Sequence, residues 1–370
     1  MKILYGVQGT GNGHTTRARV MAKAFNQRDD IQVDYLFSGR DEDRYFDMQV
    51  FGDYQTRRGF TFVHHQGAID HWRTFKAFRP VRFIRDVMSL DLSGYDLVIN
   101  DFEPISAWAA KRQNVPCISI SHQDSFRHNV PKQGDNLINR LVLKYFAPSK
   151  IQLGVHWYHF GFPIMPPFIE DEYVPDSGAD HVLVYLPFES IEDIGQFLDP
   201  LSEVNFLCFH PDIRQDSDQG HIKWRKTSKE GFHLALQSAN GVIANGGFEL
   251  SSECLKLGKK LLLKPLHGQF EQLSNILTLE QLSLCQSMSS LDVEEVEAWL
   301  ELPAAEPIAF PSDPQILVDW LLQGQWQDTQ SICNQLWQQV QFPERLKRHL
   351  ADYEPLQTQN EKPVASQSNL

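Results

Sequence analysis

The chain has 370 residues, of which 42% are hydrophobic and 11% aromatic, and this length supports two hydrophobic cores rather than one. Its formal net charge of −13 argues against nonspecific nucleic-acid binding, because phosphates demand a basic protein face. The 5 cysteines show no Cys-x-x-Cys spacing, so neither a zinc site nor a disulfide framework is predicted. With no signal peptide and no apolar run long enough to span a bilayer, a cytoplasmic protein is expected.

The amino-terminal segment predicts a strand, a glycine-rich loop and a helix. Residues 1–7 are aliphatic and β-branched, the loop Gln8-Gly-Thr-Gly-Asn-Gly-His14 follows, and residues 15–25 have helical character. The loop glycines do not have the G-x-G-x-x-G spacing, and the second strand, near 31–37, ends without an acid for a ribose hydroxyl. This argues against a nicotinamide cofactor, and no cofactor is expected.

The first candidate site combines the histidine of this loop with acids that follow a later strand. The strand near 96–101 ends in Asp101, and Glu103 follows two residues later. Because the carboxyl ends of parallel strands share one sheet edge, we predict His14 as a general base with Asp101 and Glu103 as acidic candidates. Two plainer interpretations stay open: His14 caps the first helix, or Asp101 is an acid at a helix start.

A second group of polar candidates lies in the first loop and after the strand near 116–120. It comprises Gly11, Asn12, Gly13, His122, Gln123 and Asp124. We expect these residues to line a substrate pocket at the same sheet edge. Plain turn residues are the alternative, because polar loops at strand ends are common.

One segment, residues 71–85, breaks the acidic trend. Basic residues alternate there with apolar ones: Arg73, Lys76, Arg79, Arg82 and Arg85 among Trp72, Phe75, Phe78, Phe83 and Ile84. A basic, aromatic amphipathic surface suits peripheral contact with an anionic membrane, here at its inner face. The alternative is a pair of helices, broken at Pro80, that buries its aromatics and leaves its arginines in water.

Strands alternate with helical segments along the chain, which predicts an α/β fold with parallel sheets and helices on both faces. Two strand series are expected, near 2–7, 31–37, 60–64, 96–101 and 116–120, and near 181–187, 205–210, 221–225, 241–245 and 261–264. A proline-rich run, 161–167, separates them. The expected domains are 1–162 and 163–318, followed by C-terminal helices in 319–353 and a disordered tail, 354–370.

The most informative segment is 238–272, which reads as strand, glycine turn, helix, strand and polar loop. Unpaired N–H groups of a helix that starts after Gly246 and Gly247 favour an anion such as a pyrophosphate. One turn further, Glu253 can accept both hydroxyls of a ribose. The full set of candidates is Gly246, Gly247, Phe248, Ser252, Glu253 and His267, with Glu271 and Gln272 as ligands of sugar hydroxyls. An ordinary strand-to-helix turn with a surface glutamate is the alternative.

This segment is similar to the donor-binding segment of GT-B glycosyltransferases, specifically the MurG-type, family 28-like N-acetylglucosaminyltransferases. The similarity rests on Ser252-Glu253 after the glycine turn and on Pro265-Leu-His267 ahead of Glu271-Gln272. Three other stretches resemble that family. The loop ending in His14 is similar to its Gly-Thr-Gly-Gly-His loop, and residues 121–125 with 136–140 are similar to its His-Glu-Gln loop and the Asn-Arg helix after it. Residues 161–167 resemble its interdomain hinge. The chain has Glu271 where that family usually has glutamine, which leaves the transferred sugar open.

The resemblance implies two Rossmann-like domains whose parallel sheets face each other across a cleft, and a terminal helix that crosses back onto the first domain. It implies transfer of a hexose or N-acetylhexosamine from a nucleotide-diphosphate sugar, with UDP the expected nucleotide. The acceptor would be a saccharide or a lipid-linked molecule of the cell envelope, and the reaction an inverting single displacement. Glu253 would hold the ribose and Gln272 the sugar, and no metal would be needed. Two alternatives share this fold, a nucleotide-sugar 2-epimerase and a non-catalytic nucleotide-sugar-binding protein.

Overall fold

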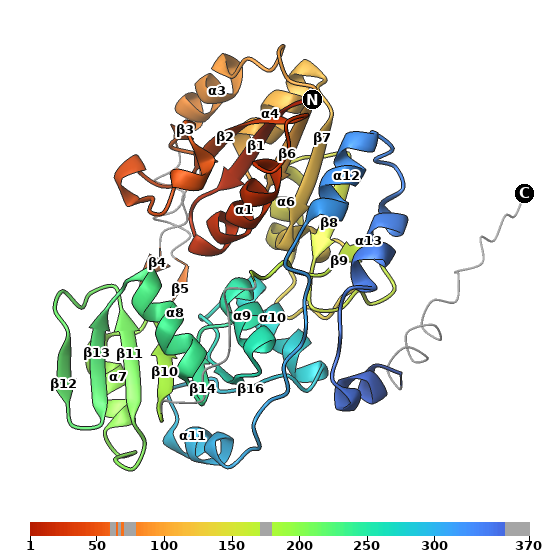
Figure 1. Cartoon of the computed structure of the whole chain (residues 1–370). Coiled ribbons are helices and arrows are strands. Elements are labelled where there is room, and N and C mark those ends of the chain that lie inside the picture. The colour runs from red at the N-terminus through yellow and green to blue at the C-terminus, as the bar shows by residue number, and fades with distance from the viewer. Residues whose placement is uncertain (60–63, 66–67, 70–78, 171–179, 352–370) are drawn as a thin grey trace, which may run out of the picture.

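The computed structural model describes residues 1–59, 64–65, 68–69, 79–170 and 180–351, which form two lobes (Figure 1). The strands of the N-terminal lobe are β1 (Lys2–Gln8), β2 (Gln32–Ser38), β3 (Tyr54–Arg57), β6 (Leu97–Asp101), β7 (Cys117–Ser121), β8 (Ile151–Val155) and β9 (Ile164–Met165). They form one 7-stranded sheet of order β3-β2-β1-β6-β7-β8-β9, and every neighbouring pair is parallel.

The C-terminal lobe repeats this design. Its strands are β10 (Val182–Tyr185), β11 (Phe206–His210), β12 (Ser217–Gln219), β13 (Ile222–Lys226), β14 (Gly241–Ala244), β15 (Lys260–Leu263) and β16 (Gln286–Ser287). The 7-stranded sheet has the order β12-β13-β11-β10-β14-β15-β16, and its pairs are parallel except for the antiparallel edge pair β12 and β13. Separately, β4 (His64–His65) pairs antiparallel with β5 (Ala68–Ile69).

Both sheets reverse their strand order beside their first strand, which fixes where a ligand can bind. In the N-terminal lobe β1 lies between β2 and β6, and in the C-terminal lobe β10 lies between β11 and β14. In doubly wound sheets ligands bind outside the carboxyl ends of the strands at this switch point. The first switch point holds the loop after β1 and Asp101 at the end of β6, and the second holds the loop after β14, residues 245–247.

Helices cover both faces of the N-terminal sheet, as the alternation of β1 requires. Leu4 packs with Val87 and Ile105 on one face, whereas Ile3 and Tyr5 pack on the opposite face. The helices of this lobe are α1 (Asn12–Phe25), α3 (Pro80–Ser89), α4 (Pro104–Gln113), α5 (His122–Ser125) and α6 (Leu137–Tyr145), with short 3-10 turns η1 (Glu42–Arg44) and η2 (Gln49–Phe51).

The remaining helices belong to the C-terminal half of the chain. They are α7 (Ile191–Leu198), α8 (Lys229–Ser238), α9 (Phe248–Leu257), α10 (Phe270–Gln281), α11 (Val293–Leu300), α12 (Gln315–Gln323) and α13 (Thr329–Trp337), and residues 344–351 are also helical. Figure 1 shows α12 and α13 beside the N-terminal lobe. Trp337 Nε1 donates a 2.6 Å hydrogen bond to Ile164 O, and Arg28 pairs with Asp319 at 2.6 Å. The helices α12 and α13 are thereby tied to the first lobe, whereas His349, near the end of the described chain, lies 2.6 Å through Nε2 from Gln281 O of α10.

The two lobes touch through a continuous apolar interior. A single hydrophobic cluster contains Phe126 and Trp157 from the N-terminal lobe together with Phe248 and Ile276 from the C-terminal lobe. Among the residues that the structure describes, no helix is long and apolar enough to cross a membrane.

The expected fold class, two Rossmann-like domains with parallel sheets, is confirmed. Details differ from the sequence prediction. β3 takes the third strand position, whereas most of the strand predicted at 60–64 lies outside the described residues, as do 71–78 and the tail 354–370. β8 and β16 were not predicted, and part of the expected hinge, Ile164–Met165, is the edge strand β9.

Candidate active site

His14 and Asp101 form a close pair at the switch point of the N-terminal sheet. His14 lies in the first turn of α1, Asp101 is the last residue of β6, and His14 Nδ1 is 2.8 Å from Asp101 Oδ1. An ionised carboxylate only accepts hydrogen bonds, so Nδ1 carries the hydrogen and Nε2 is the nitrogen that can take up a proton. The pair has the geometry of an imidazole base oriented by an acid.

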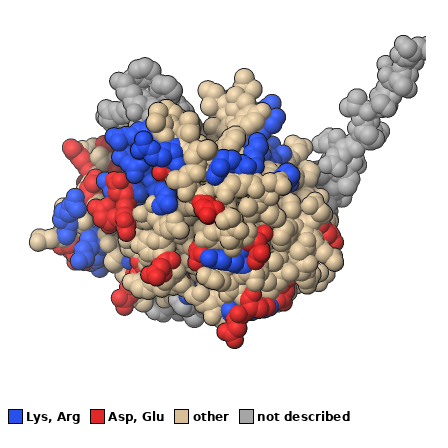
Figure 2. All heavy atoms as spheres, turned by 90° about the horizontal axis from the view of Figure 1, so that it is seen from above, with Lys and Arg blue, Asp and Glu red and all other residues tan. Residues whose placement is uncertain are grey.

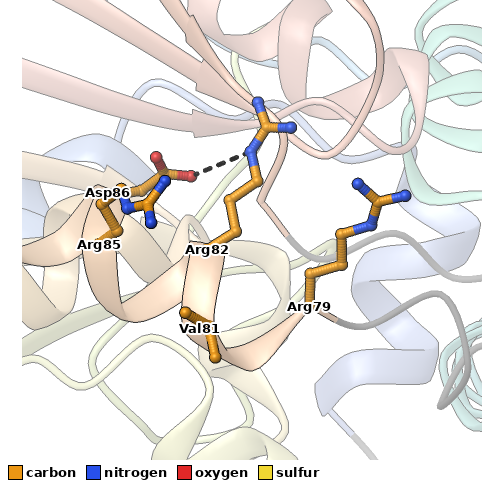
Figure 3. A pocket seen from close by; sticks show the side chains of 5 residues that line it. All are labelled: Arg79, Val81, Arg82, Arg85 and Asp86. Carbon is orange, nitrogen blue, oxygen red and sulfur yellow. Dashed lines mark ion pairs between the residues drawn. The ribbon is translucent and has the colours of Figure 1, made fainter.

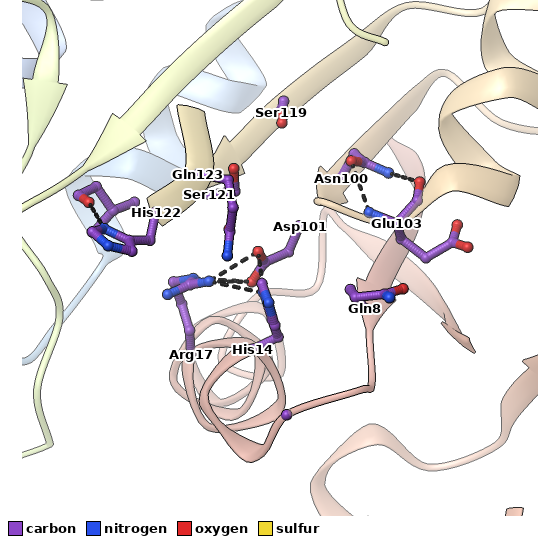
Figure 4. A network of polar contacts seen from close by, with 12 residues as sticks. Gln8, His14, Arg17, Asn100, Asp101, Glu103, Ser119, Ser121, His122 and Gln123 are labelled. Carbon is purple, nitrogen blue, oxygen red and sulfur yellow. Dashed lines mark hydrogen bonds and ion pairs between the residues drawn. The ribbon is translucent and has the colours of Figure 1, made fainter. Parts of the chain in front are cut away.

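Arg17, one turn further along α1, holds the acid of this pair. Arg17 Nε donates to Asp101 Oδ2 at 2.9 Å and Nη2 donates to Oδ1 at 2.9 Å, while Nη2 passes 3.1 Å from His14 Nδ1 (Figure 4). Burial on its own would raise the pKa of the fully buried Asp101, but Arg17 and His14 hold that pKa below its usual value. Asp101 is therefore ionised at neutral pH.

Glu249, in the first turn of α9, connects the C-terminal lobe to this network. Its Oε1 accepts a hydrogen bond from Arg17 Nη1. A Cβ added to Gly13 would stand 2.7 Å from Glu249 Cγ, so the glycine at this position permits the close approach of the two helix starts. Burial raises the pKa of Glu249 to about 7, and Asp101 adds to the rise, whereas Arg17 and His14 oppose it.

Glu103, predicted as a second acid beside the general base His14, lies in a different environment. It is the N-cap of α4, where its carboxylate accepts hydrogen bonds from the backbone N–H groups of Ile105 at 2.8 Å and Ser106 at 2.6 Å. The Ser38 hydroxyl donates a third bond at 2.6 Å, and burial raises the pKa of Glu103. These contacts assign Glu103 a capping role in the scaffold, which corrects the catalytic interpretation.

The helices α1 and α9 start at the two switch points on glycine. Their N-cap residues, Gly11 and Gly247, make no side-chain cap, and an added Cβ at either would meet nothing within 4 Å. The first N–H groups of both helices therefore have no capping side chain as acceptor, and the positive end of the helix dipole favours an anion at such a helix start. Gly246 differs, because a Cβ there would lie 2.9 Å from Gln272 O.

Asn245 is a polar residue at the second switch point that the sequence analysis did not single out. Its side chain is only 7% exposed, Nδ2 donates to Lys264 O at 2.8 Å, and Oδ1 has no hydrogen-bond partner within the protein. Lys264 in turn pairs with Glu189 at 2.5 Å, above the same sheet edge. A buried oxygen without a partner is rare and favours a polar ligand or water at this place.

His122, Phe248 and Ser252 lie in the contact between the lobes. The His122 ring stacks on Phe248 with centroids 3.9 Å apart, and its Nδ1 and Nε2 lie 2.8 Å from Val155 O and 2.7 Å from Asn275 Oδ1. Ser252 Oγ accepts a 2.8 Å bond from Trp157 Nε1. The three residues were predicted to line substrate pockets, but they are almost fully buried and join the two lobes instead.

Gln123 and Glu271 meet across the lobes. Gln123 Nε2 donates to Glu271 Oε2 at 3.0 Å, whereas the buried Gln123 Oε1 has no partner in the protein. Gln272 Oε1 accepts a 2.8 Å bond from Leu266 N and so holds the loop after β15. Asp124 of α5, predicted as a pocket residue, accepts bonds from Ser119 and Ser121 of the preceding strand β7 and pairs with Arg127.

The other predicted residues are spread around this region. Glu253 is a buried residue of α9, 8% exposed, and His267 is exposed in the loop after β15. Arg40 clamps the glycine loop: its guanidinium donates to Gly11 O at 2.8 Å and to Asn12 Oδ1 at 3.1 Å. The start of α1, which carries His14, is therefore held by a residue that follows β2.

Residues 1–303 match the sequence family described as glycosyl transferase family 1. The chain belongs to this family. Solved structures of similar fold include the glycotransferase of kitacinnamycin, with 13% identity, a TM-score of 0.58, and coverage of 92% of this chain and 99% of that chain. LpCGTa in complex with UDP has 13% identity, a TM-score of 0.57 and coverage of 96% and 99%. MurG of Acinetobacter baumannii has 15% identity, a TM-score of 0.53 and coverage of 87% and 99%.

These neighbours share the GT-B fold with this family 1 glycosyltransferase, and the predicted resemblance to GT-B enzymes of the MurG type is confirmed. A comparison with curated proteins finds no match. The main site residues that sequence reasoning missed are Arg17, Glu249 and Asn245. Arg17 had a signal, because it stands three positions after His14 and so on the same helix face, whereas Glu249 pairs with a residue 232 positions away and had none.

Proposed function

We propose that this glycosyltransferase moves a hexose or N-acetylhexosamine from a UDP-linked donor to an acceptor hydroxyl with inversion, using His14 as the general base and no metal. The observation that carries the proposal is the His14 and Asp101 pair, 2.8 Å apart, at the start of α1, opposite the uncapped start of α9. A base and an anion-binding helix end are the two groups that sugar transfer from a diphosphate needs.

In the proposed reaction His14 Nε2 takes the proton of the acceptor hydroxyl, and Asp101 stabilises the imidazolium that forms. The acceptor oxygen forms a bond to C1 of the sugar while the bond from C1 to the diphosphate oxygen breaks. The leaving diphosphate keeps the electron pair, and the N–H groups at the start of α9 and the helix dipole stabilise its charge. Attack from the face opposite the leaving group inverts the configuration at C1.

The donor is assigned to the C-terminal lobe because the open space at Gly247 lies at the switch point of its sheet. We assign the ribose to Glu253 and the sugar hydroxyls to Glu271, Gln272 and the unpaired oxygen of Gln123. UDP is the proposed nucleotide because LpCGTa, a solved structure of similar fold, holds UDP.

A thermal-shift titration with UDP, GDP, ADP, dTDP and NAD tests the donor site, because a ligand that binds only the native state raises the melting temperature. We expect UDP to stabilise the wild type and the shift to be lost in Glu253→Ala. Stabilisation by another nucleoside diphosphate would overturn the choice of UDP. No shift with any nucleoside diphosphate, or a shift with NAD alone, would overturn the donor site itself.

Turnover separates a transferase from its alternatives. With UDP-glucose or UDP-N-acetylglucosamine and a saccharide acceptor, NMR of the product should show the anomer opposite to that of the donor, at a rate unaffected by EDTA. Release of free UDP from UDP-N-acetylglucosamine without any acceptor would favour the 2-epimerase. Nucleotide binding with no turnover under any condition would favour a binding protein.

We further propose that the acceptor is lipid-linked and that α3 and α6 rest on an anionic membrane. Both helices lie beside α4: α3 packs against it, and Trp108 of α4 donates to Tyr145 O at 3.2 Å. Apolar residues on their outer sides are largely exposed: Val81, Ile84 and Met88 on α3, and Leu137, Ile138, Leu141 and Tyr145 on α6. Phe83 packs inward, as the alternative interpretation of 71–85 required of its aromatics.

Basic side chains surround this apolar surface. Arg79, the N-cap of α3, lines a surface hollow together with Arg82, Arg85 and Asp86 of that helix (Figure 3), and α6 adds Arg140 and Lys144. Figure 2 shows Lys and Arg side chains gathered in the upper part of that view, beside uncharged surface. Each basic residue near an anionic membrane contributes roughly 1 kcal/mol, reduced here where Asp86 and Asp135 pair with arginines.

Co-sedimentation with vesicles tests this surface. We expect binding to phosphatidylglycerol-containing vesicles at low salt, weaker binding at high salt, and none to pure phosphatidylcholine. Ile84→Ser should weaken binding, whereas Leu234→Ser should not, because Leu234 is equally exposed at 60% but lies on α8 of the other lobe. If the two variants bind alike, or the wild type ignores anionic vesicles, the membrane proposal fails.

A further inference from the structure

Arg17 contacts both the His14 and Asp101 pair and a residue of the opposite lobe. From α1 it donates two bonds to Asp101, one to each carboxylate oxygen, and a further bond to Glu249 of α9. Arg17 is 6% exposed and Asp101 is fully buried, so little water competes for these bonds. A chain of contacts therefore runs from His14 through Asp101 and Arg17 to Glu249.

The forked guanidinium of Arg17 determines the orientation of the Asp101 carboxylate. Two parallel N–H donors fix the plane of a carboxylate, which a single donor cannot do. The Asp101 oxygen that accepts from Arg17 Nη2 is the oxygen that faces His14 Nδ1. Rotation of the carboxylate would break this arrangement. The position of Arg17 therefore determines, through Asp101, how the His14 imidazole is oriented.

Glu249 adds a condition to this arrangement, because it comes from the other lobe. Its contact with Arg17 forms only while the start of α9 lies against the start of α1, at the close approach of Gly13. The same helix start is the proposed site of the donor diphosphate. The lobe that would carry the donor thus also supplies Glu249, the hydrogen-bond partner of the arginine that orients the base.

We propose that Arg17 is a positioning residue that couples contact between the lobes to the orientation of the His14 and Asp101 pair, with Glu249 as its anchor on the donor-binding lobe. This inference rests on the proposed function, because it assumes that His14 acts as the base. It goes beyond that function by assigning a role to two residues that touch neither reacting atom.

Glu249→Ala and Glu249→Gln test the anchor while leaving both bonds between Arg17 and buried Asp101 in place. We expect kcat of the alanine variant to fall on the order of 10- to 100-fold, because small misplacement of a base is costly. Glutamine keeps an oxygen that Arg17 can reach, so this conservative variant should stay within about threefold of wild type. UDP affinity, measured by calorimetry, should be equal or tighter in both, because a negative charge beside the diphosphate is removed.

A double-mutant cycle with Arg17→Lys tests whether the two residues act through each other. Lysine keeps the charge but cannot bond both oxygens of Asp101 and Glu249 at once, so Glu249→Ala should add little to its defect. Asp319→Asn is the matched control, since it removes the exposed pair with Arg28 that also links distant parts of the chain. Its kcat should equal that of wild type.

The inference would be overturned by full activity of Glu249→Ala, by equal loss in the alanine and glutamine variants, or by independent effects in the cycle. Loss of UDP binding together with kcat would also overturn it, because that result marks Glu249 as a donor ligand or a folding residue. A wild type that binds UDP and transfers no sugar would instead count against the proposed function. The two failures are therefore distinguishable.

Discussion

Gly13 of α1 lies so close to Glu249 of α9 that a Cβ at Gly13 would stand 2.7 Å from Glu249 Cγ. Gly13→Ala should therefore hold the two lobes apart at the site and lower kcat by about tenfold. Alanine favours the helix by roughly 1 kcal/mol, which offsets part of the steric cost, so the melting temperature should change little. Kinetic assays beside thermal unfolding would show this split.

Gly94→Ala is the control for the Gly13 variant. An added Cβ at Gly94 meets nothing within 4 Å, so the substitution changes the backbone preference alone. Activity of Gly94→Ala should match wild type. A fully active Gly13→Ala variant would mean that the close contact of the lobes is not needed for turnover.

Asp101→Asn should lower kcat on the order of 10²- to 10⁴-fold while UDP binding stays intact. The amide can donate to His14 Nδ1, which moves the ring hydrogen to Nε2 and removes the base. The substitution also removes one of the two carboxylates that pair with buried Arg17 and leaves it with Glu249 alone, at a cost of up to about 3–5 kcal/mol in unfolding free energy at neutral pH.

The cost of Asp101→Asn should depend on pH in a defined direction. Arg17 and His14 hold the pKa of Asp101 below its unfolded value, against the effect of burial, so its stabilisation is present above about pH 4 and lost as pH falls through the folded pKa. The difference in unfolding free energy between wild type and variant should therefore shrink in acid. A constant difference in denaturant titrations from pH 7 to pH 3 would contradict the ion pairing.

The alternation of strands and helices along the sequence predicts much of the fold, but it does not predict the edge strands of the sheets. The central strands β1, β6 and β14 are short apolar runs that can only be buried in a sheet. β3, with the sequence Tyr-Gln-Thr-Arg, is an edge strand with little apolar character, so its pairing comes from β2 rather than from its own residues.

The candidate site was predictable where chemistry and strand ends coincide, as for His14 and Asp101. Glu103 was misread because it follows the same strand, although Pro104 directly after it is a sign of a helix N-cap. His122 was misread because its partners, Phe248 and Asn275, come from the other lobe. Contacts of this kind depend on how the lobes meet, which local sequence does not specify.

Glu249→Gln should change the pH dependence of stability in the opposite sense to Asp101→Asn. Burial raises the pKa of Glu249 to about 7, above its unfolded value of about 4.3. Between these values the folded protein binds more protons than the unfolded chain, so wild type loses stability as pH rises. Glutamine does not titrate, and the melting temperature of the variant relative to wild type should rise from about pH 4.5 to pH 7. A difference that falls over this range would contradict the raised pKa.

Gly246 and Gly247 offer a matched pair that separates folding from donor binding. A Cβ at Gly246 would lie 2.9 Å from Gln272 O and 2.9 Å from Ile276 Cγ1, so Gly246→Ala should destabilise the C-terminal lobe by about 1–3 kcal/mol. Gly247 has a φ of −74° and open space around it, so Gly247→Ala should fold with an unchanged melting temperature. Its methyl group would nevertheless occupy the approach to the first N–H groups of α9, and UDP affinity should fall on the order of tenfold or more. Thermal unfolding and UDP calorimetry on both variants measure the two effects separately. If Gly247→Ala binds UDP as wild type does, the diphosphate does not lie at the start of α9.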